Sequence, residues 1–217
     1  MPINWYPGHM ARAKRLLIDQ LSRADVVVEL CDARLPRSSR NPDLEALTRH
    51  KTRVTALGKS DLADPTETER WLKLFRAQGI DCAALDVKKQ PKQAQALIDR
   101  AAKAAVERAA ARGIKKTVRA MVVGVPNVGK STFINSLHGG AIARTGDRPG
   151  VTRANQWVKV SPYFEIMDTP GLLWPRFDDP IAARRLAYIA AIKDEILDTA
   201  ELAIQLLTDL IAIAPDA

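Results

Sequence analysis

Eight consecutive residues, Gly124 to Ser131, have the residue types and the spacing of a loop that binds nucleotide phosphates. They read Gly-Val-Pro-Asn-Val-Gly-Lys-Ser, and the two glycines allow the backbone to wrap closely around phosphate oxygens. In such a phosphate loop the Lys130 ammonium can reach the terminal phosphates, and the Ser131 hydroxyl is placed to bind Mg²⁺. The apolar run before the loop and the helical pattern after it argue against a chance match. The residues predicted to contact the nucleotide here are Asn127, Val128, Gly129, Lys130, Ser131 and Thr132.

Further groups that suit a metal and a phosphate follow the phosphate loop. Asp168 ends a strand-like segment, which is where P-loop enzymes keep the carboxylate that supports Mg²⁺. Thr152, in the loop before that segment, is a plausible second hydroxyl ligand of the metal. Gly171 can offer its N–H group to a γ-phosphate because no Cβ obstructs the approach. The predicted metal ligands are therefore Ser131, Thr152 and Asp168.

The base is expected to be read upstream, by the base-reading loop Gly58-Lys59-Ser60-Asp61. The Asp61 carboxylate can accept two hydrogen bonds from the N1–H and N2–H₂ edge of guanine, which adenine does not offer. The stem of Lys59 can cover the flat face of the base. The alternative is an ordinary surface turn, in which a Lys-Ser-Asp triplet is common. The sequence predicts a guanine site on these four residues.

Alternating strands and helices must position these loops. Strands of a parallel sheet end at one edge, and ligands bind beyond that edge. Asp64 and Pro65 predict a helix start, with Glu67 returning the capping bond. Strands are predicted at 25–31, 53–57, 81–86 and 120–123, and a pair of strands that resembles a hairpin is predicted at 156–160 and 163–167. Helices are predicted at 11–22, 64–79 and 91–112, with one more directly after the phosphate loop and two more from residue 179 onward.

Composition limits the compartment and the partners. The 217 residues are 47% hydrophobic, enough for a full core, without a bilayer-spanning stretch or a signal peptide, so a soluble cytoplasmic protein is expected. Cys31 and Cys82 lack metal-ligand spacing and are predicted to be reduced core thiols. The formal net charge of +8 favours a nucleic acid partner, although a solvated basic surface is the alternative.

The order of these motifs resembles the circularly permuted GTPases of the RbgA/YlqF family, known as ribosome biogenesis GTPase A. The resemblance rests on the base-reading loop preceding the phosphate loop, with several other segments in the family's order. These segments are 4–10 (Asn-Trp-Tyr-Pro-Gly-His-Met), 149–152, 168–171, 174–180 and 191–198. It implies an α/β fold, the Ras-like parallel-sheet fold of P-loop NTPases, circularly permuted, with a short C-terminal helical segment.

The resemblance also implies a domain organisation and an activity. The GTPase domain would span 1–175, with an N-terminal arm at 1–22, a base-reading half at 23–112 and a phosphate and Mg²⁺ half at 117–175; 176–217 would be the C-terminal segment. Members of the family bind GTP and Mg²⁺, and they hydrolyse GTP when bound to precursors of the large ribosomal subunit. GTP, GDP and that precursor are therefore the expected partners, without a membrane, and a monomer is expected.

Two further site assignments come from the resemblance. Leu172 and Leu173 stand where Ras-like enzymes place a water-positioning Gln. The family assigns that role to the histidine that is His9 here, whereas its position beside a Pro-Gly turn alone favours a turn or capping residue. Asn127 stands where related GTPases place a K⁺ ligand, so K⁺ is a candidate second cation.

The chain departs from the family pattern at three places. Gly58 replaces the Asn of Asn-Lys-x-Asp, which removes a contact to the base and a tie to the phosphate loop, so weaker affinity is expected. The segment 85–87 matches the family's third base-contacting loop poorly and is assigned no site residue. The family continues into a C-terminal RNA-binding domain, so an uncovered apolar stripe is expected. The stripe is Leu202, Leu206, Leu207, Leu210 and Ile211.

The leading functional hypothesis is a GTP-hydrolysing assembly factor whose nucleotide state controls association with the pre-ribosome. An alternative is a nucleotide-dependent RNA- or ribosome-binding module with negligible hydrolysis, favoured by Gly58 and by the missing Gln. A P-loop ATPase or small-molecule kinase is disfavoured by Lys59 and Asp61. For the apolar stripe, a truncated chain, a shortened family member and a partner-covered face remain alternatives.

Overall fold

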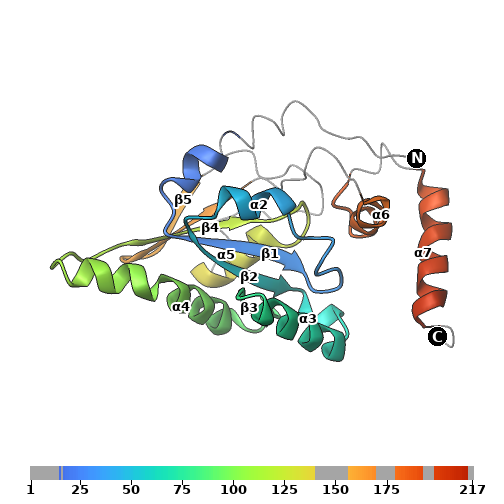
Figure 1. Ribbon diagram of the computed structural model, residues 1–217, viewed down its shortest axis with the longest axis horizontal. Helices are drawn as coiled ribbons and strands as arrows, with labels where there is room; N and C mark the ends of the chain where they lie inside the picture. The colour runs from blue at the N-terminus through green and yellow to red at the C-terminus, as the bar shows by residue number, and fades with distance from the viewer. Residues whose placement is uncertain (1–14, 16, 140–155, 170–178, 193–197, 215–217) are drawn as a thin grey trace.

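The computed structural model describes residues 15, 17–139, 156–169, 179–192 and 198–214 of the chain (Figure 1). In this part of the chain, six strands form one sheet in the order β3-β2-β1-β4-β6-β5. All neighbouring strands are parallel except β5, which pairs antiparallel with β6. The strands are β1 (Val26–Asp32), β2 (Thr52–Gly58), β3 (Asp81–Leu85), β4 (Val118–Val123), β5 (Gln156–Ser161) and β6 (Phe164–Asp168).

The central strand β1 is buried along its whole length, as its apolar sequence predicts. Glu29, in the middle of this strand, accepts hydrogen bonds from the Asn41 N–H at 3.1 Å and from Arg40 at 3.4 Å. The pairing registers place Asp32 beside Gly58 and Val122 beside Asp168. The predicted parallel sheet is therefore confirmed, and the ends of these strands lie at one edge of it.

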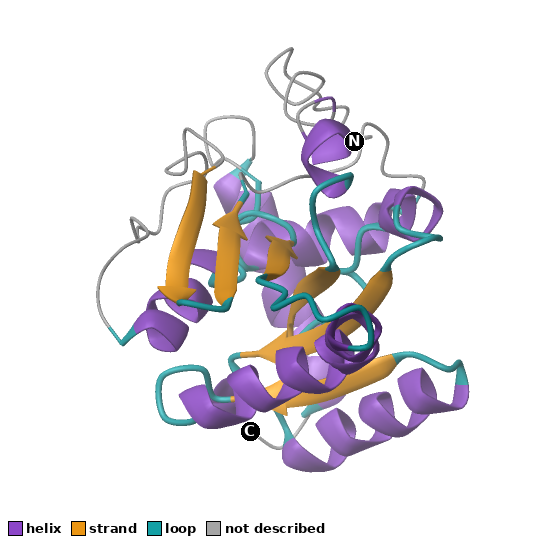
Figure 2. Cartoon of the chain, turned by 90° about the vertical axis from the view of Figure 1, so that its left-hand side faces the viewer, coloured by secondary structure: helices purple, strands orange, loops and turns teal. Residues whose placement is uncertain are grey.

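Helices cover both faces of the sheet (Figures 1 and 2). One face, which includes Val28 and Leu30, packs against α4, α5 and α6. The opposite face packs against Leu17 and Leu21 of the N-terminal helical residues, and against α2 and α3. The helices in the described residues include α2 (Pro42–Leu47), α3 (Pro65–Ala77), α4 (Pro91–Ala110), α5 (Lys130–His138), α6 (Pro180–Tyr188) and α7 (Thr199–Ile213), with the 3-10 turn η1 (Ser60–Leu62).

Two local predictions need correction. Asp64 caps α3 by accepting from the Glu67 N–H at 2.8 Å, but the Glu67 carboxylate accepts from Arg70 instead of completing the capping box. The short helix α2 was not predicted, because its six residues follow a loop rich in Arg, Ser and Pro. Asn41 starts it by accepting from the Asp43 N–H at 2.9 Å.

The two C-terminal helices differ in burial. Leu186 and Ala187 of α6 belong to the core of the sheet, whereas α7 has no buried residue. Arg184 of α6 hydrogen-bonds Gln205 and Asp209 of α7. Of the predicted apolar stripe, Leu206, Leu207, Leu210 and Ile211 are exposed, but Leu202 packs against the main core, so that part of the expectation is wrong. Among the described residues, no helix has both the length and the apolarity to cross a membrane.

Both cysteines are buried free thiols, in agreement with their predicted place in the core. Cys31 lies on β1 and Cys82 on β3. Burial raises the pKa of each thiol, so neither is poised as a thiolate nucleophile at neutral pH.

Candidate nucleotide-binding site

The phosphate loop leaves the carboxyl end of β4 and enters α5. A Cβ atom at Gly124 would lie 2.4 Å from the Leu30 carbonyl oxygen, so any other residue would push the loop off β1. Gly129 has φ +98°, a conformation that favours glycine, and it forms the N-cap of α5. The first N–H groups of α5 have no carbonyl partner within the helix and carry the positive end of its dipole. The loop therefore presents an anion-binding helix terminus at the sheet edge.

Lys130 is folded into this loop with 7% of its surface exposed. Its ammonium donates to the Val125 carbonyl at 3.0 Å and to the Gly124 carbonyl at 3.3 Å. Burial lowers the pKa of Lys130 to about 8, and the nearby Asp168 charge only partly opposes this effect. A phosphate anion is a stronger partner for the ammonium than two neutral carbonyls.

Two predicted Mg²⁺ ligands meet across the loop. The Ser131 hydroxyl donates to Asp168 Oδ2 at 2.8 Å, and Asp168 is buried at the end of β6. Thr169 fixes this strand end by donating to the Val122 carbonyl at 2.7 Å. A hydroxyl beside a buried carboxylate is an all-oxygen donor pair, which suits a hard cation such as Mg²⁺. The residues present thus fit the predicted metal.

The base-reading loop follows β2 and lies against the phosphate loop. Lys59, in the left-handed conformation with φ +58°, donates from Nζ to the Asn127 carbonyl at 2.8 Å. Lys59 therefore ties the two loops where the glycine at position 58 has no side chain to do so. The expected loss of nucleotide affinity stays a prediction. Ser60 and Asp61 begin η1, and the Asp61 carboxylate is exposed at the edge.

Asp32, the last residue of β1, and Ser39 lie beside the base-reading loop, although no sequence motif singled them out. Asp32 is 0% exposed and lies 3.2 Å from the Lys59 ammonium, between Oδ2 and Nζ. Ser39 is also buried, and its hydroxyl accepts from the Asp32 N–H at 2.9 Å. The signal available in the sequence was an acidic residue at the carboxyl end of a mostly apolar strand. Ala33 and Ser38 of the same loop are buried as well.

Asn127 also connects the phosphate loop to the C-terminal helices. Its side-chain Nδ2 donates to the Ala190 carbonyl at 2.7 Å, just after α6. Ala190 has φ +54°, and the next two residues, Ala191 and Ile192, are buried in the core. The amide oxygen of Asn127 is the atom that would bind K⁺, so the α6 corner contacts the same side chain.

Of the predicted site residues, the structure brings Lys59, Asn127, Lys130, Ser131 and Asp168 together. Val128 has its side chain in the core, and Thr132 lies half-buried on α5. His9, Thr152 and Gly171 lie outside the described residues, as do Leu172 and Leu173. Their roles stay predictions.

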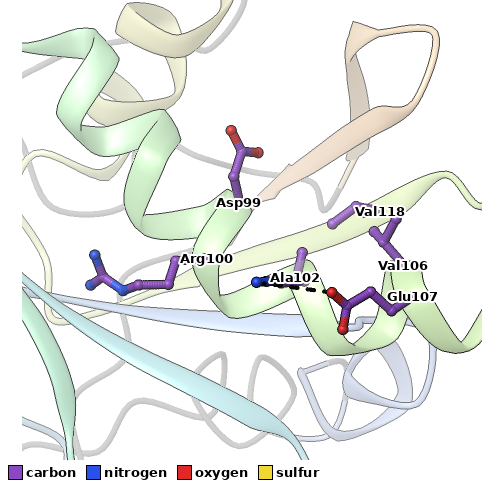
Figure 3. Close-up of a pocket in the computed structure, with 7 residues that line it drawn as sticks. Asp99, Arg100, Ala102, Val106, Glu107 and Val118 are labelled. Carbon is purple, nitrogen blue, oxygen red and sulfur yellow. Dashed lines mark ion pairs between the residues drawn. The ribbon is translucent and has the colours of Figure 1, made fainter.

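A groove elsewhere on the molecule contains none of these residues. It has a volume of about 530 Å³ and lies along α4, with Val118 at the start of β4 among its lining residues (Figure 3). The phosphate loop leaves the other end of that strand. The groove therefore lies at the opposite edge of the sheet from the candidate site.

Comparison with known proteins gives consistent matches. A family model described as 50S ribosome-binding GTPase matches residues 119–216. "Ribosome biogenesis GTPase A" of Priestia megaterium is 46% identical over 220 aligned residues, covering 100% of this chain and 76% of that protein.

Two solved structures are also similar. "GDP-bound structue of TM YlqF" has a TM-score of 0.66 and 26% identity, covering 92% of this chain and 77% of that one. "GNP-bound YlqF from T. maritima" has a TM-score of 0.68 at 24% identity, covering 93% and 75%, and supports the fold.

Proposed function

The chain belongs to the ribosome biogenesis GTPase A family, and we propose that its sheet edge binds GTP through the base-reading and phosphate loops. It is a GTP hydrolase and a ribosome assembly factor. The observation that carries the residue assignment is the 2.8 Å hydrogen bond from Lys59 to Asn127, which joins two loops 68 residues apart. With the loops joined, Asp61 reads guanine while Lys130 and the backbone at 127–132 hold the phosphates.

Ser131 and Asp168 hold Mg²⁺ in this proposal, with Thr152 as a further hydroxyl ligand and with Asp168 acting through water. When bound, Mg²⁺ supplies positive charge to the β- and γ-phosphates. The chain's part is to present one oxygen donor from the first turn of α5 and one from the end of β6. Gly171 is assigned the γ-phosphate contact.

Hydrolysis requires a water molecule to attack the γ-phosphorus while the bond to the β–γ bridging oxygen breaks and GDP leaves. Lys130 is placed to balance charge on the phosphate oxygens. His9 is assigned the task of orienting the water when the ribosome is bound. K⁺ held by the Asn127 amide oxygen would add positive charge between the phosphates.

The partner we propose is the precursor of the large ribosomal subunit, contacted through RNA and protein in the cytoplasm by a monomeric protein. The formal net charge of +8 supports an RNA contact. GTP favours the associated state, and hydrolysis promotes release. The Asn127 to Ala190 hydrogen bond gives the phosphate loop a direct contact with the C-terminal helices, which a change of nucleotide would affect.

Two measurements on the full chain test this proposal. Equilibrium binding should favour GDP and GTP analogues over ADP and ATP analogues, because Asp61 recognises guanine. Phosphate release from GTP should be slow for the protein alone and faster with large ribosomal subunits. Equal binding of guanine and adenine nucleotides would overturn the base assignment, and a rate unchanged by subunits would overturn the proposed partner.

The His9→Ala variant separates the assigned histidine from the rest of the site. Nucleotide affinity and the slow basal rate should stay at the parent values, whereas the stimulated rate should disappear. A variant that retains full stimulation would remove His9 from the mechanism without affecting the GTP site.

A further inference from the structure

Asp32 is a buried charge that neither the predicted nor the proposed site uses. Arg34 donates to Oδ1 through Nε at 2.9 Å and to Oδ2 through Nη2 at 2.7 Å, and its backbone N–H also donates to Oδ1 at 3.1 Å. Burial by itself raises the pKa of Asp32, but the Arg34 hydrogen bonds and the Lys59 charge together lower it below its ordinary value. Asp32 is therefore an anion held inside the protein, facing the base-reading loop.

Lys59 is held between two fixed acceptors. Its ammonium is 3.2 Å from Asp32 Oδ2 and 2.8 Å from the Asn127 carbonyl oxygen. A lysine side chain has four rotatable bonds, and fixing it in one position costs conformational entropy. The attraction between the Asp32 carboxylate and the Lys59 ammonium offsets this cost. In a partly desolvated site that attraction is strong, so it favours one position of the ammonium over the others.

We propose that Asp32 is a positioning residue for guanine recognition, because it holds the Lys59 ammonium on the Asn127 carbonyl. Through Lys59, the Asp32 carboxylate helps to hold the base-reading loop against the phosphate loop. An Asn side chain at position 58 would otherwise make a contact of this kind. Arg34 donates to both oxygens of Asp32 and compensates the negative charge, so the carboxylate stays buried. This inference rests on the proposed function, in which the base-reading loop binds guanine through Asp61.

The same strand offers a matched control. Glu29 is also on β1, is also 0% exposed and is also paired with an arginine, Arg40, at 3.4 Å. Its partners are on the loop at 40–41 and not on the base-reading loop. Glu29→Gln therefore removes a buried carboxylate without touching Lys59.

The test compares Asp32→Asn with Glu29→Gln in the full chain. Kd values for GDP and ADP and the thermal unfolding midpoint are measured for both variants and for the parent. Asp32→Asn should lower the ratio of Kd for ADP to Kd for GDP by about tenfold, because one charged contact in the tie is lost. Glu29→Gln should lower the unfolding midpoint and leave the ratio unchanged. Equal ratios in the two variants would overturn the proposal.

A second substitution tests the tying role directly. A Cβ at Gly58 would lie 3.3 Å from Leu30 Cδ1 and 3.7 Å from the Val128 carbonyl, so an Asn side chain needs only a small shift of Leu30. Gly58→Asn should restore most of the lost selectivity in the Asp32→Asn background. Absence of any rescue would indicate that Asp32 has no tying role.

A protein that does not prefer guanine can be distinguished from one in which Asp32 has no positioning role. If the parent protein binds GDP and ADP equally, the proposed function fails before any variant is measured. If Asp32→Asn does not fold, Arg34→Gln tests the same cluster, because the Arg34 side chain is 36% exposed and tolerates a polar amide better. Arg34→Gln should also lower the ratio of Kd for ADP to Kd for GDP, and an unchanged ratio would overturn the proposal.

Discussion

On the phosphate side of the site, the structure is built from glycines, buried aliphatic side chains and one buried ammonium, whereas the base side is held by ion pairs. Val125 and Val128 are buried beneath the phosphate loop, and Lys130 is 7% exposed. On the base side, Asp32 pairs with Arg34 and Lys59, and Asp61 is exposed.

This difference indicates which side of the site sets the affinity for nucleotides and which side sets the preference for guanine over adenine. The phosphate side is shaped by close packing, since a Cβ atom at Gly124 would clash with the Leu30 carbonyl oxygen, so few substitutions are compatible with it. The base side depends on side chains that can be exchanged singly. Substitutions should therefore remove nucleotide binding on the first side and tune base preference on the second.

Removal of the phosphate-side charge should have the largest effect. Lys130→Met should weaken GDP binding by more than about 100-fold, since charged hydrogen bonds of about 1.5–3 kcal/mol each are lost to the phosphates. The free protein should unfold at the same or a higher temperature, because a buried ammonium is replaced by an apolar side chain. Isothermal titration and thermal unfolding measure the two effects.

Lys103→Met is the control for that substitution. Lys103 lies on α4 with 74% of its side chain exposed, at the groove far from the phosphate loop. Replacing it should change neither the affinity for GDP nor the unfolding temperature. Retained GDP binding in Lys130→Met would mean that the loop backbone alone holds the phosphates.

The base side should give the next largest effect. Asp61→Asn should weaken GDP binding by about 10- to 100-fold, because the amide cannot accept both guanine hydrogen bonds. Xanthosine diphosphate, which has an oxygen in place of the guanine amino group, should gain affinity by accepting from the new amide. Competition binding with both nucleotides measures the exchange, and unchanged preference for GDP would remove Asp61 from base recognition.

Much of the architecture could be predicted from the sequence because strong local patterns agree with the tertiary structure. The apolar β1 segment and the Asp64-Pro65 helix start both form as predicted. The helix α2 could not be predicted, because six residues give too little periodicity and its start depends on Asn41 beside buried Glu29.

The candidate site was only partly predictable for a related reason. Glycine, lysine and serine at fixed spacing identify the phosphate loop because that chemistry is local. Asp32 lies 27 residues before Lys59, and the parallel register that brings their strands together, Asp32 beside Gly58, is a tertiary property. The bond from Asn127 to Ala190 likewise depends on how α6 packs on the sheet.

A change of pH should have a smaller effect on the phosphate side than the substitutions above, and it acts through the ionisation of Lys130. Lys130 has a pKa of about 8 in the folded protein instead of 10.5, so its charge costs stability below pH 8. That cost disappears as the pH rises from 8 to 10.5, and the free protein gains stability relative to Lys130→Met. Bound phosphates favour the protonated form, so GDP affinity should fall about fourfold from pH 7 to 8.5.

Lys130→Met is also the control for this titration, because it shares every nucleotide ionisation with the parent protein. The fourfold change is the difference between the two proteins, measured at constant ionic strength. If both lose affinity equally, the titrating group is not Lys130.

Restoring an Asn on the base side should have the smallest effect in the parent protein. Gly58→Asn should tighten GDP binding by no more than about threefold, because Lys59 already ties the loops through the Asn127 carbonyl. ADP affinity should not change, since the phosphate side is untouched. A gain of tenfold or more, measured by GDP titration, would mean that the Lys59 tie is weak and that the base side is held less firmly than its ion pairs indicate. A loss would instead place the cost in the contact with Leu30, where the new Cβ would lie 3.3 Å from Cδ1.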